Sequence, residues 1–415
     1  MIIEFSVANY RSVKDIQTFN MSAANIVSKY KEVDVTNTIK VSDKLTLLKS
    51  KAIYGANASG KSNLIKAFQT FIIVIQDSVK DSKVLRNKID PFKLSTETEN
   101  LPSFFQLIFV LNNVQYRYGF EVTRDEIVSE WLMGTPGKKE VPFFTREGKI
   151  ISVNENKFRE GIKIRDLYSQ PENDIARNNS LFLTTVRSFG GLLSGEIINY
   201  LSEIFVITGL SDFKMYKAAE DYIAEDKNLS RISEFLKVAD VGIDQIKRFE
   251  YQDKDDHEAK TYTLTYHKKF GKDLESNDVA SLFMLIDESE GTKKMFEIGP
   301  FVIEALKRKK VLLFDEFDAR FHPVITKKLV ELFNSEANQG SQLIFATHDT
   351  NLLNAKLLRR DQVCFVEKDK YGSSHFYTLV DFKGVRNDSS FEKDYISGRY
   401  GAIPFVGDFN SVISD

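Results

Sequence analysis

Residues 55–62 of this 415-residue chain read Gly55-Ala56-Asn57-Ala58-Ser59-Gly60-Lys61-Ser62. An apolar run at 45–54 precedes them, and a helix-like pattern of apolar residues follows. Between a strand and a helix, the spacing G-x-x-x-x-G-K-S predicts a phosphate-binding P-loop, the Walker A motif. Its glycines let backbone N–H groups turn inward around phosphates, and the helix N-terminus adds a favourable dipole. The stretch predicts an α/β fold of the P-loop NTPase type, because the alternative, an ordinary glycine–serine turn, does not explain the flanking strand and helix.

The chemistry of the P-loop predicts ATP and Mg²⁺ as its ligands. We expect Lys61 to reach the β- and γ-phosphates and to assist catalysis, and the Ser62 hydroxyl to bind Mg²⁺. Nucleotide contacts from this loop are expected at Gly55, Asn57, Ser59, Gly60, Lys61, Ser62 and Asn63.

The composition is that of an ordinary globular protein with room for two or three domains, at 42% hydrophobic and 28% charged residues. A formal charge of −2 by itself predicts neither a nucleic-acid nor a membrane partner. The single cysteine, Cys364, excludes an internal disulfide and suits a reducing cytoplasm. The N-terminus does not resemble a signal peptide, and no apolar run is long enough to span a bilayer. We expect a soluble, cytoplasmic protein.

A second motif lies at residues 310–316, where four apolar residues are followed by Asp315 and Glu316. This pattern predicts a central parallel strand with carboxylates at its C-terminal end, where α/β sheets bind ligands. We expect Asp315 to lie in the Mg²⁺ shell and Glu316 to act as the general base for the attacking water. An acidic turn is the alternative, but the order after an upstream P-loop favours a Walker B motif.

These motifs resemble ABC-type ATPases of the RecF/SMC/Rad50 kind. The resemblance is carried by N-Y-R-S at 9–12, the P-loop, D-E-F-D-x-x-x-H-P at 315–323, and a strand ending near His348. It implies that Arg11 lies near the nucleotide, that Asp318 belongs to a nucleotide site at a dimer interface, and that His348 is the catalytic switch histidine. The structural alternatives are a solvated arginine and a core histidine.

The same resemblance identifies residues 287–296 as the position of the ABC signature. Here Ser289 is also a good helix N-cap, and Gly291 follows it, but the second glycine and the glutamine of L-S-G-G-Q are absent. The resemblance implies that Ser289 and Gly291 bind the γ-phosphate of ATP held by an opposite subunit. Hydrolysis would then require a head-to-tail homodimer with two composite sites, and assembly into a higher homo-oligomer stays open.

Three parts are expected along the chain. Residues 1–141 would form the N-terminal part of the ATPase domain with an antiparallel β-layer, in which strand patterns occupy 104–111, 114–122 and 127–133. Residues 142–277 would be an inserted, mainly helical α+β domain without a long coiled coil, and 278–415 would complete the ATPase domain. Within the insert, the charge run 252–258 predicts a solvated turn, and the basic stretch 267–272 an exposed loop. No motif identifies a Q-loop glutamine, and Gln106, the nearest candidate, has the pattern of a strand residue.

The C-terminal pattern Y-x-x-G-R-Y-G-A-x-P at 395–404 is similar to prokaryotic RloA- and AbiL-type ATPases of abortive infection and phage defence. This similarity implies control of a protein effector or toxin encoded nearby. A RecF-like DNA-binding repair ATPase is the alternative, and nucleic acid stays open as a partner. An OLD-type nuclease is rejected because too little chain follows Val366-Glu367-Lys368-Asp369 for a TOPRIM domain. A slowly hydrolysing scaffold is not excluded.

Overall fold

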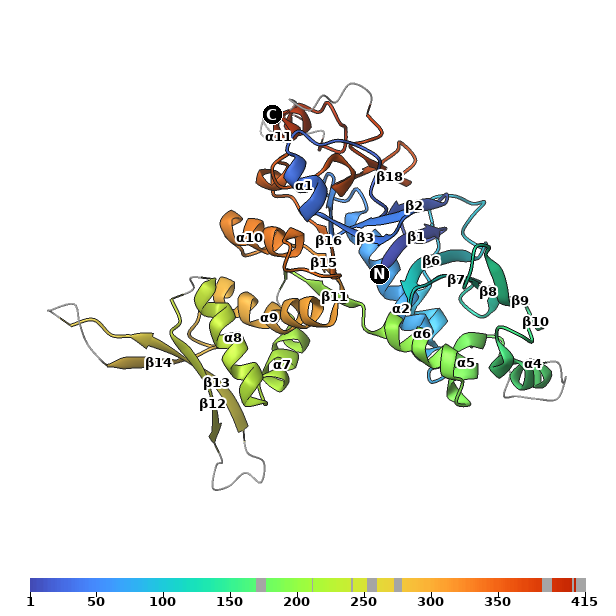
Figure 1. The fold of residues 1–415 in the computed structure, drawn as a ribbon, viewed down its shortest axis with the longest axis horizontal. Coiled ribbons are helices and arrows are strands. Elements are labelled where there is room, and N and C mark those ends of the chain that lie inside the picture. The colour runs from blue at the N-terminus through green and yellow to red at the C-terminus, as the bar shows by residue number, and fades with distance from the viewer. Residues whose placement is uncertain are drawn as a thin grey trace, which may run out of the picture.

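The computed structural model describes residues 1–168, 177–210, 212–239, 242–251, 260–271, 278–382, 390–404 and 407. Two large sheets enclose a long helix, and a smaller unit projects to one side (Figure 1). Among the described residues, no helix has both the length and the apolar character needed to cross a membrane. The charge run 252–258 lies outside the described residues, as does Lys272 at the end of the basic stretch.

A six-stranded mixed sheet carries the P-loop. Its order is β11-β15-β16-β5-β17-β18; the first five strands are parallel, and β18 adds an antiparallel edge. Strands β5 and β16 are buried along their whole length because side chains cover both faces of the sheet. The strands are β5 (Ser50–Tyr54), β11 (Phe205–Thr208), β15 (Val311–Asp315), β16 (Gln342–Ala346), β17 (Val363–Lys368) and β18 (Ser374–Thr378).

A seven-stranded antiparallel sheet lies beside it, in the order β10-β9-β8-β7-β6-β1-β2. The hairpin between β6 and β7 turns at Asn112 and Asn113, whose φ values of 50° and 61° suit a two-residue hairpin loop. All three predicted strands of the β-layer are confirmed. The strands are β1 (Ile2–Ala8), β2 (Gln17–Asn20), β6 (Ser103–Leu111), β7 (Val114–Val122), β8 (Ile127–Thr135), β9 (Val141–Glu147) and β10 (Ile150–Val153).

Helix α2 (Lys61–Asp77) fills the space between the two sheets. It is apolar on most of its circumference, which is why it is buried rather than half-exposed. The Phe68 ring stacks on Phe5 of β1 with centroids 3.8 Å apart, and the Phe71 ring stacks on Phe120 of β7 at 5.3 Å. This packing fixes the direction of α2 and hence the position of the P-loop at its N-terminus.

The projecting unit contains α7 (Phe213–Tyr222), α8 (Asp226–Val238) and a sheet in the order β12-β13-β14 (Figure 1). Its strands are β12 (Gln245–Tyr251), β13 (Lys260–Lys268) and β14 (Val279–Phe283). Helix α9 (Glu290–Arg308) packs against α7 and α8 and also against β15, so it joins this unit to the P-loop sheet.

The boundaries expected at 141/142 and 277/278 differ from the structure. Strands β9 and β10 continue the seven-stranded sheet to Val153, and β11 pairs with β15 inside the P-loop sheet. Strand β14 belongs to the projecting sheet although it lies beyond 277. Sequence patterns did not indicate this because strand pairing over long separations is decided by tertiary packing.

The remaining elements include a two-stranded sheet, β3-β4, and helices such as α10, which packs against the central strands β5 and β16. They are α1 (Lys31–Thr36), β3 (Thr38–Ser42), β4 (Leu45–Leu48), α3 (Val84–Lys88), α4 (Ile162–Tyr168), α5 (Phe182–Ser188), α6 (Leu192–Ser202), α10 (Pro323–Asn334), α11 (Phe391–Ile396) and the 3-10 turns at Arg159–Gly161, Thr350–Leu352 and Arg360–Gln362.

Candidate functional site

The P-loop connects β5 to α2 and depends on two glycines. A Cβ atom at Gly55 would lie 2.4 Å from the Val366 carbonyl oxygen, and one at Gly60 would lie 2.2 Å from Ser374 Oγ. Gly60 also has a φ of 116°, which disfavours residues with a side chain. Both glycines are therefore required by the close approach of β17 and β18, in addition to the turn itself.

Lys61 folds back onto the loop. Its Nζ donates hydrogen bonds to the carbonyl oxygens of Gly55 at 2.9 Å and Ala56 at 3.1 Å. Burial lowers the pKa of Lys61, and the nearby carboxylates of Glu316 and Asp315 partly oppose that shift. The ammonium group is thus held over the loop, partly desolvated, beside the two Walker B acids.

The predicted Mg²⁺ residues lie together. Ser62 Oγ, in the first turn of α2, donates a hydrogen bond to Asp315 Oδ1 at 3.1 Å, and the Glu316 backbone N–H donates to the same oxygen at 3.1 Å. A hydroxyl and a carboxylate oxygen at this spacing fit Mg²⁺, which takes one or two protein oxygens and completes its shell with phosphate and water. Among the described residues, no group of three or more His, Cys, Asp or Glu side chains makes an all-protein metal site.

A cleft of ≈ 600 Å³ opens above this pair. The P-loop forms its floor from Asn57 to Asn63, and Glu316, His348 and Lys368 complete its lining. The structure thus brings the predicted base and the predicted histidine to the P-loop from two other strands. Lys368, at the end of β17, was not predicted and adds a second cationic side chain to the lining.

Glu316 has an unusual backbone. Its φ is 54°, in the left-handed region that few residues other than glycine adopt. Gly209, just after β11, donates its N–H to the Asp315 carbonyl at 2.7 Å, and a Cβ atom on Gly209 would lie 1.7 Å from the Glu316 carbonyl oxygen. The absence of a side chain at Gly209 therefore permits the backbone position of Glu316.

Asp318 serves as an internal acceptor and is not among the residues that line the cleft of its own chain. Its Oδ1 accepts hydrogen bonds from Thr347 Oγ1 at 2.7 Å and from the His348 backbone N–H at 3.0 Å. This joins the loop after β15 to the loop after β16. Burial, followed by the positive charge of Lys61, lowers the pKa of His348. The imidazole is therefore neutral at pH 7.

Arg11, expected near the nucleotide, is not among the residues that line the cleft, and its side chain contacts Tyr10. Its Nε donates to the Tyr10 hydroxyl at 3.2 Å, and its guanidinium lies 5.7 Å from the centre of the Tyr10 ring. The neighbouring Ser12 contacts the P-loop helix instead. Its Oγ accepts hydrogen bonds from Asn63 Nδ2 at 2.8 Å and from Ser374 Oγ at 2.8 Å. The N-terminal loop thus supports the P-loop through Ser12, and Asn63 is used for this support.

The two signature residues lie at the start of α9, outside the lining of the cleft. Ser289 is exposed and caps the helix, accepting a hydrogen bond from the Thr292 N–H at 3.2 Å. A Cβ atom at Gly291 would lie 3.1 Å from the Arg320 carbonyl, and Arg320 forms an ion pair with Glu290. The signature is therefore held against the loop that follows Walker B.

The C-terminal pattern packs onto the P-loop sheet. Rings of Tyr395 and Tyr400 lie 5.3 and 5.7 Å from the ring of Phe365 in β17, and Tyr395 also contacts Tyr54, at 5.7 Å. The Tyr377 hydroxyl donates to the Tyr400 carbonyl at 2.9 Å. Residues 391–402 thus have a structural role, behind the strand that leads into the P-loop.

Sequence reasoning missed Ser12, Gly209, Lys368 and Ser374. Ser12 ends the N-Y-R-S stretch, where Arg11 was expected to make the contact, and the other three belong to no local motif because each reaches the site from another strand or loop. Gln106 is a strand residue, as expected: it lies in β6, outside the cleft lining, and accepts a hydrogen bond from Trp131 Nε1 at 3.2 Å.

Comparison with known proteins supports this arrangement. Residues 52–354, which include both Walker motifs, the signature and His348, match the protein family described as "AAA domain, putative AbiEii toxin, Type IV TA system". No curated protein matches the chain.

A search of solved structures finds Smc head domains at low sequence identity. One is the SMC head domain from Thermotoga maritima, at 11% identity and a TM-score of 0.41, covering 91% of this chain and 98% of that one. Another is the Smc head with an extended coiled coil from Pyrococcus furiosus, bound to the C-terminal domain of ScpA, at 14% identity and a TM-score of 0.42, covering 96% and 98%. The Smc head domain from Pyrococcus yayanosii has 12% identity and a TM-score of 0.44, covering 91% and 96%.

The predicted fold class is confirmed: an α/β P-loop architecture with an antiparallel sheet beside a mixed, largely parallel sheet. Because the family match extends over most of the chain, the chain belongs to the AAA-domain ATPase family whose description links it to the AbiEii toxin and type IV toxin–antitoxin systems.

Proposed function

We propose that this chain binds Mg-ATP in the P-loop cleft and hydrolyses it as a head-to-tail homodimer. The observation that carries the proposal is the Ser62–Asp315 hydrogen bond in a cleft that Glu316 and His348 also line. These are the oxygen ligands, the base and the neutral imidazole that phosphoryl transfer to water needs.

Each residue has a defined part in the reaction. Lys61 exchanges its two carbonyl partners for phosphate oxygens, so nucleotide binding also frees the loop that it holds. Bound Mg²⁺, held by Ser62 and Asp315, would neutralise charge on the β- and γ-phosphates. Glu316 accepts a proton from the attacking water, and His348 orients that water by a hydrogen bond.

The proposed dimer is supported by the absence of the signature residues from the lining of the cleft in their own chain. Ser289 is exposed on the surface, where it could complete the site of a second copy, and it does not line the cleft of its own chain. Shortly before it in the chain, the Leu285 and Ile286 side chains are 48% and 71% exposed, which suits a surface that becomes covered. ATP would join two such surfaces and hydrolysis would release them, so the dimer can act as a switch.

The switch would control a partner protein, in the cytoplasm, as part of prokaryotic anti-phage defence. The toxin–antitoxin description of the family supports this assignment, and so does the C-terminal pattern shared with RloA- and AbiL-type ATPases. The RecF-like alternative uses the same ATP chemistry and differs in its partner, which would be DNA.

The test is the mass of the Glu316→Gln protein in solution, measured by light scattering with and without Mg-ATP. This variant keeps the phosphate and Mg²⁺ contacts but loses the base, so ATP should remain bound and the mass should double. Ser289→Arg should abolish the increase by introducing a bulky cation at the interface.

A matched control comes from Ser390, which caps α11 by accepting from the Lys393 N–H at 3.4 Å. Ser390→Arg removes a similar cap at a helix that neither lines the cleft nor carries the signature, and it should leave the ATP-dependent increase intact. If calorimetry shows that ATP binds and the mass still does not change, the composite site is refuted.

A further inference from the structure

The projecting sheet has two different faces. On one face Ile246, Thr263 and Thr265 are buried, and β12 packs against α8. Because side chains alternate along a strand, the residues between them point to the opposite face. That outward face has no cover among the described residues, and Figure 1 shows the sheet extending away from the two large sheets.

Aromatic side chains are concentrated on this outward face. Phe249 pairs directly with Tyr262 on the neighbouring strand, and the Tyr262 and Phe283 rings are 5.6 Å apart. Phe249, Tyr251 and Phe283 are 44%, 49% and 39% exposed. Exposed rings across adjacent strands form a flat platform on which planar groups can stack.

Cationic side chains lie among these rings. Lys247 and Lys268 project from the same face and are exposed, and Lys247 Nζ lies 4.7 Å from the centre of the Tyr266 ring. Among the outward-facing side chains that the structure describes on the three strands, none is acidic. The face is thus positively charged although the whole chain has a net charge of −2.

We propose that this outward aromatic face binds single-stranded nucleic acid. Stacking rings with interspersed cations are the two elements that bind single strands without sequence preference. A protein partner fits less well, because lysine is depleted in the centre of protein interfaces. Duplex nucleic acid fits less well because its bases are already stacked and do not present their faces.

The inward side of the same sheet is bonded to the segment that leads into the signature. The carboxylate of Glu288, the residue before Ser289, accepts a hydrogen bond from Thr265 Oγ1, and its Oε1 lies 2.7 Å from His267 Nε2. A ligand that orders the sheet therefore acts close to the signature residue. This contact gives bound nucleic acid a physical route to the proposed composite site.

The test is fluorescence anisotropy of the full chain, without ATP, with a labelled mixed-sequence DNA strand of about 16 nucleotides. An RNA strand and a DNA duplex of the same sequence form the other arms. We expect single strands to bind and the duplex to bind at least tenfold more weakly, and the DNA and RNA arms then identify the preferred sugar.

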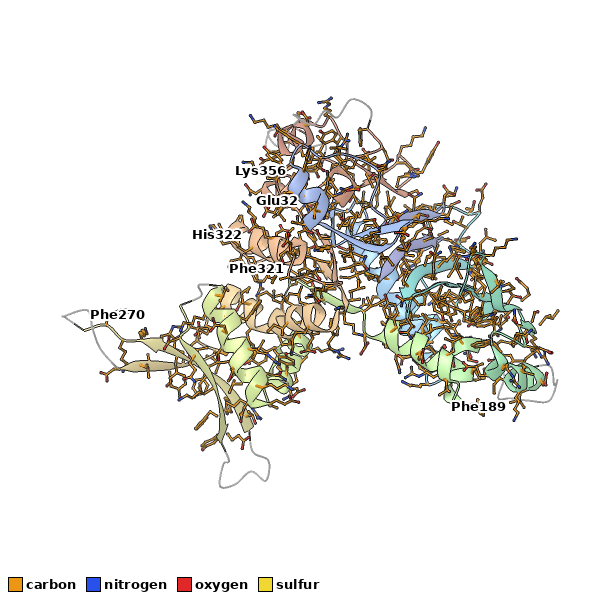
Figure 2. All side chains as sticks on the ribbon, viewed as in Figure 1. Glu32, Phe189, Phe270, Phe321, His322 and Lys356 are labelled. Atoms are coloured by element: carbon orange, nitrogen blue, oxygen red, sulfur yellow. The ribbon has the colours of Figure 1, made fainter. Side chains whose placement is uncertain are left out.

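Variants locate the binding face. Phe249→Ala should weaken binding about tenfold, because one stacked base is lost. Phe189→Ala is the matched control: that ring is 58% exposed on the opposite side of the molecule (Figure 2) and should have no effect. Lys247→Gln should lower the slope of log affinity against log salt by about 0.7. Arg248→Gln, on the same strand but the other face, should leave the slope unchanged.

Three results would overturn the proposal. They are no binding of the single strands at about 50 mM salt, tighter binding of the duplex than of the single strands, and binding by both Phe249→Ala and Lys247→Gln that equals that of the unmodified chain. No binding would assign the face to another kind of partner, tighter duplex binding would assign it to double strands, and unchanged binding by both variants would place the nucleic-acid site elsewhere. Thermal unfolding of the variants checks that they fold. Because the measurement contains no ATP, its failure would leave the ATPase proposal unaffected.

Discussion

Gly209→Ala should stop hydrolysis without preventing ATP binding. Gly209 is outside every motif, but its N–H bonds to Asp315 and its Cα faces the Glu316 carbonyl. Alanine is compatible with its backbone, because Gly209 is not among the residues of positive φ. The effect of the substitution is therefore steric and acts on the proposed base.

The magnitude follows from the geometry. The new Cβ would start 1.7 Å from the Glu316 oxygen, whereas Cβ contacts under 3.0 Å are essentially never found. The two atoms must separate by more than about 1 Å, and a displacement of that size at a catalytic group costs about 100-fold in rate. Lys61 and the P-loop lie on β5 and α2, so ATP affinity should change little.

The assay is phosphate release under single-turnover conditions, with ATP affinity measured by calorimetry and folding by thermal unfolding. Gly195→Ala, in α6, is the matched control because a Cβ atom added there would have no neighbour within 4 Å. Wild-type turnover by a folded Gly209→Ala protein would refute the role given to the Gly209–Glu316 contact. Loss of ATP binding would show that the disturbance extends to the P-loop.

Four further outcomes are expected. Lys61→Ala should abolish ATP binding by calorimetry, whereas Glu316→Gln should bind ATP and release no phosphate; turnover by the latter at the wild-type rate would identify another base. In an NMR titration His348 should have a pKa below 6.5 and stay neutral at pH 7, and Lys61→Ala should raise that pKa by removing a positive neighbour. As the pH falls, the rate of hydrolysis should consequently decline only below pH 6.5, since protonation of His348 is disfavoured. A decline that already begins near pH 8 would contradict the role assigned to His348. Glu130→Ala should lower the free energy of unfolding by about 3–5 kcal/mol in urea, because Arg146 and two N–H groups of α5 would lose their buried partner, and a loss under about 1 kcal/mol would contradict this.

The sequence by itself determined the parts of the site that are contiguous along the chain. A P-loop is a local structure, since its glycines, lysine and serine lie within eight residues, and Walker B is one strand with two acids after it. The hairpin at Asn112 and Asn113 is local for the same reason. Such elements need no knowledge of distant partners, and the structure has them where they were expected.

The tertiary structure alone decided what approaches those elements from elsewhere. Arg11 turns onto Tyr10, and Ser12 takes the contact with the P-loop helix, because a tight turn at residues 9–14 fixes which side chain points inward. Gly209 reaches the Glu316 backbone and Lys368 reaches the cleft because β11 and β17 pair in parallel with β15 and β5. Parallel pairing joins strands that are far apart in sequence, so no local pattern specifies it, and these contacts exist only once the sheet is assembled.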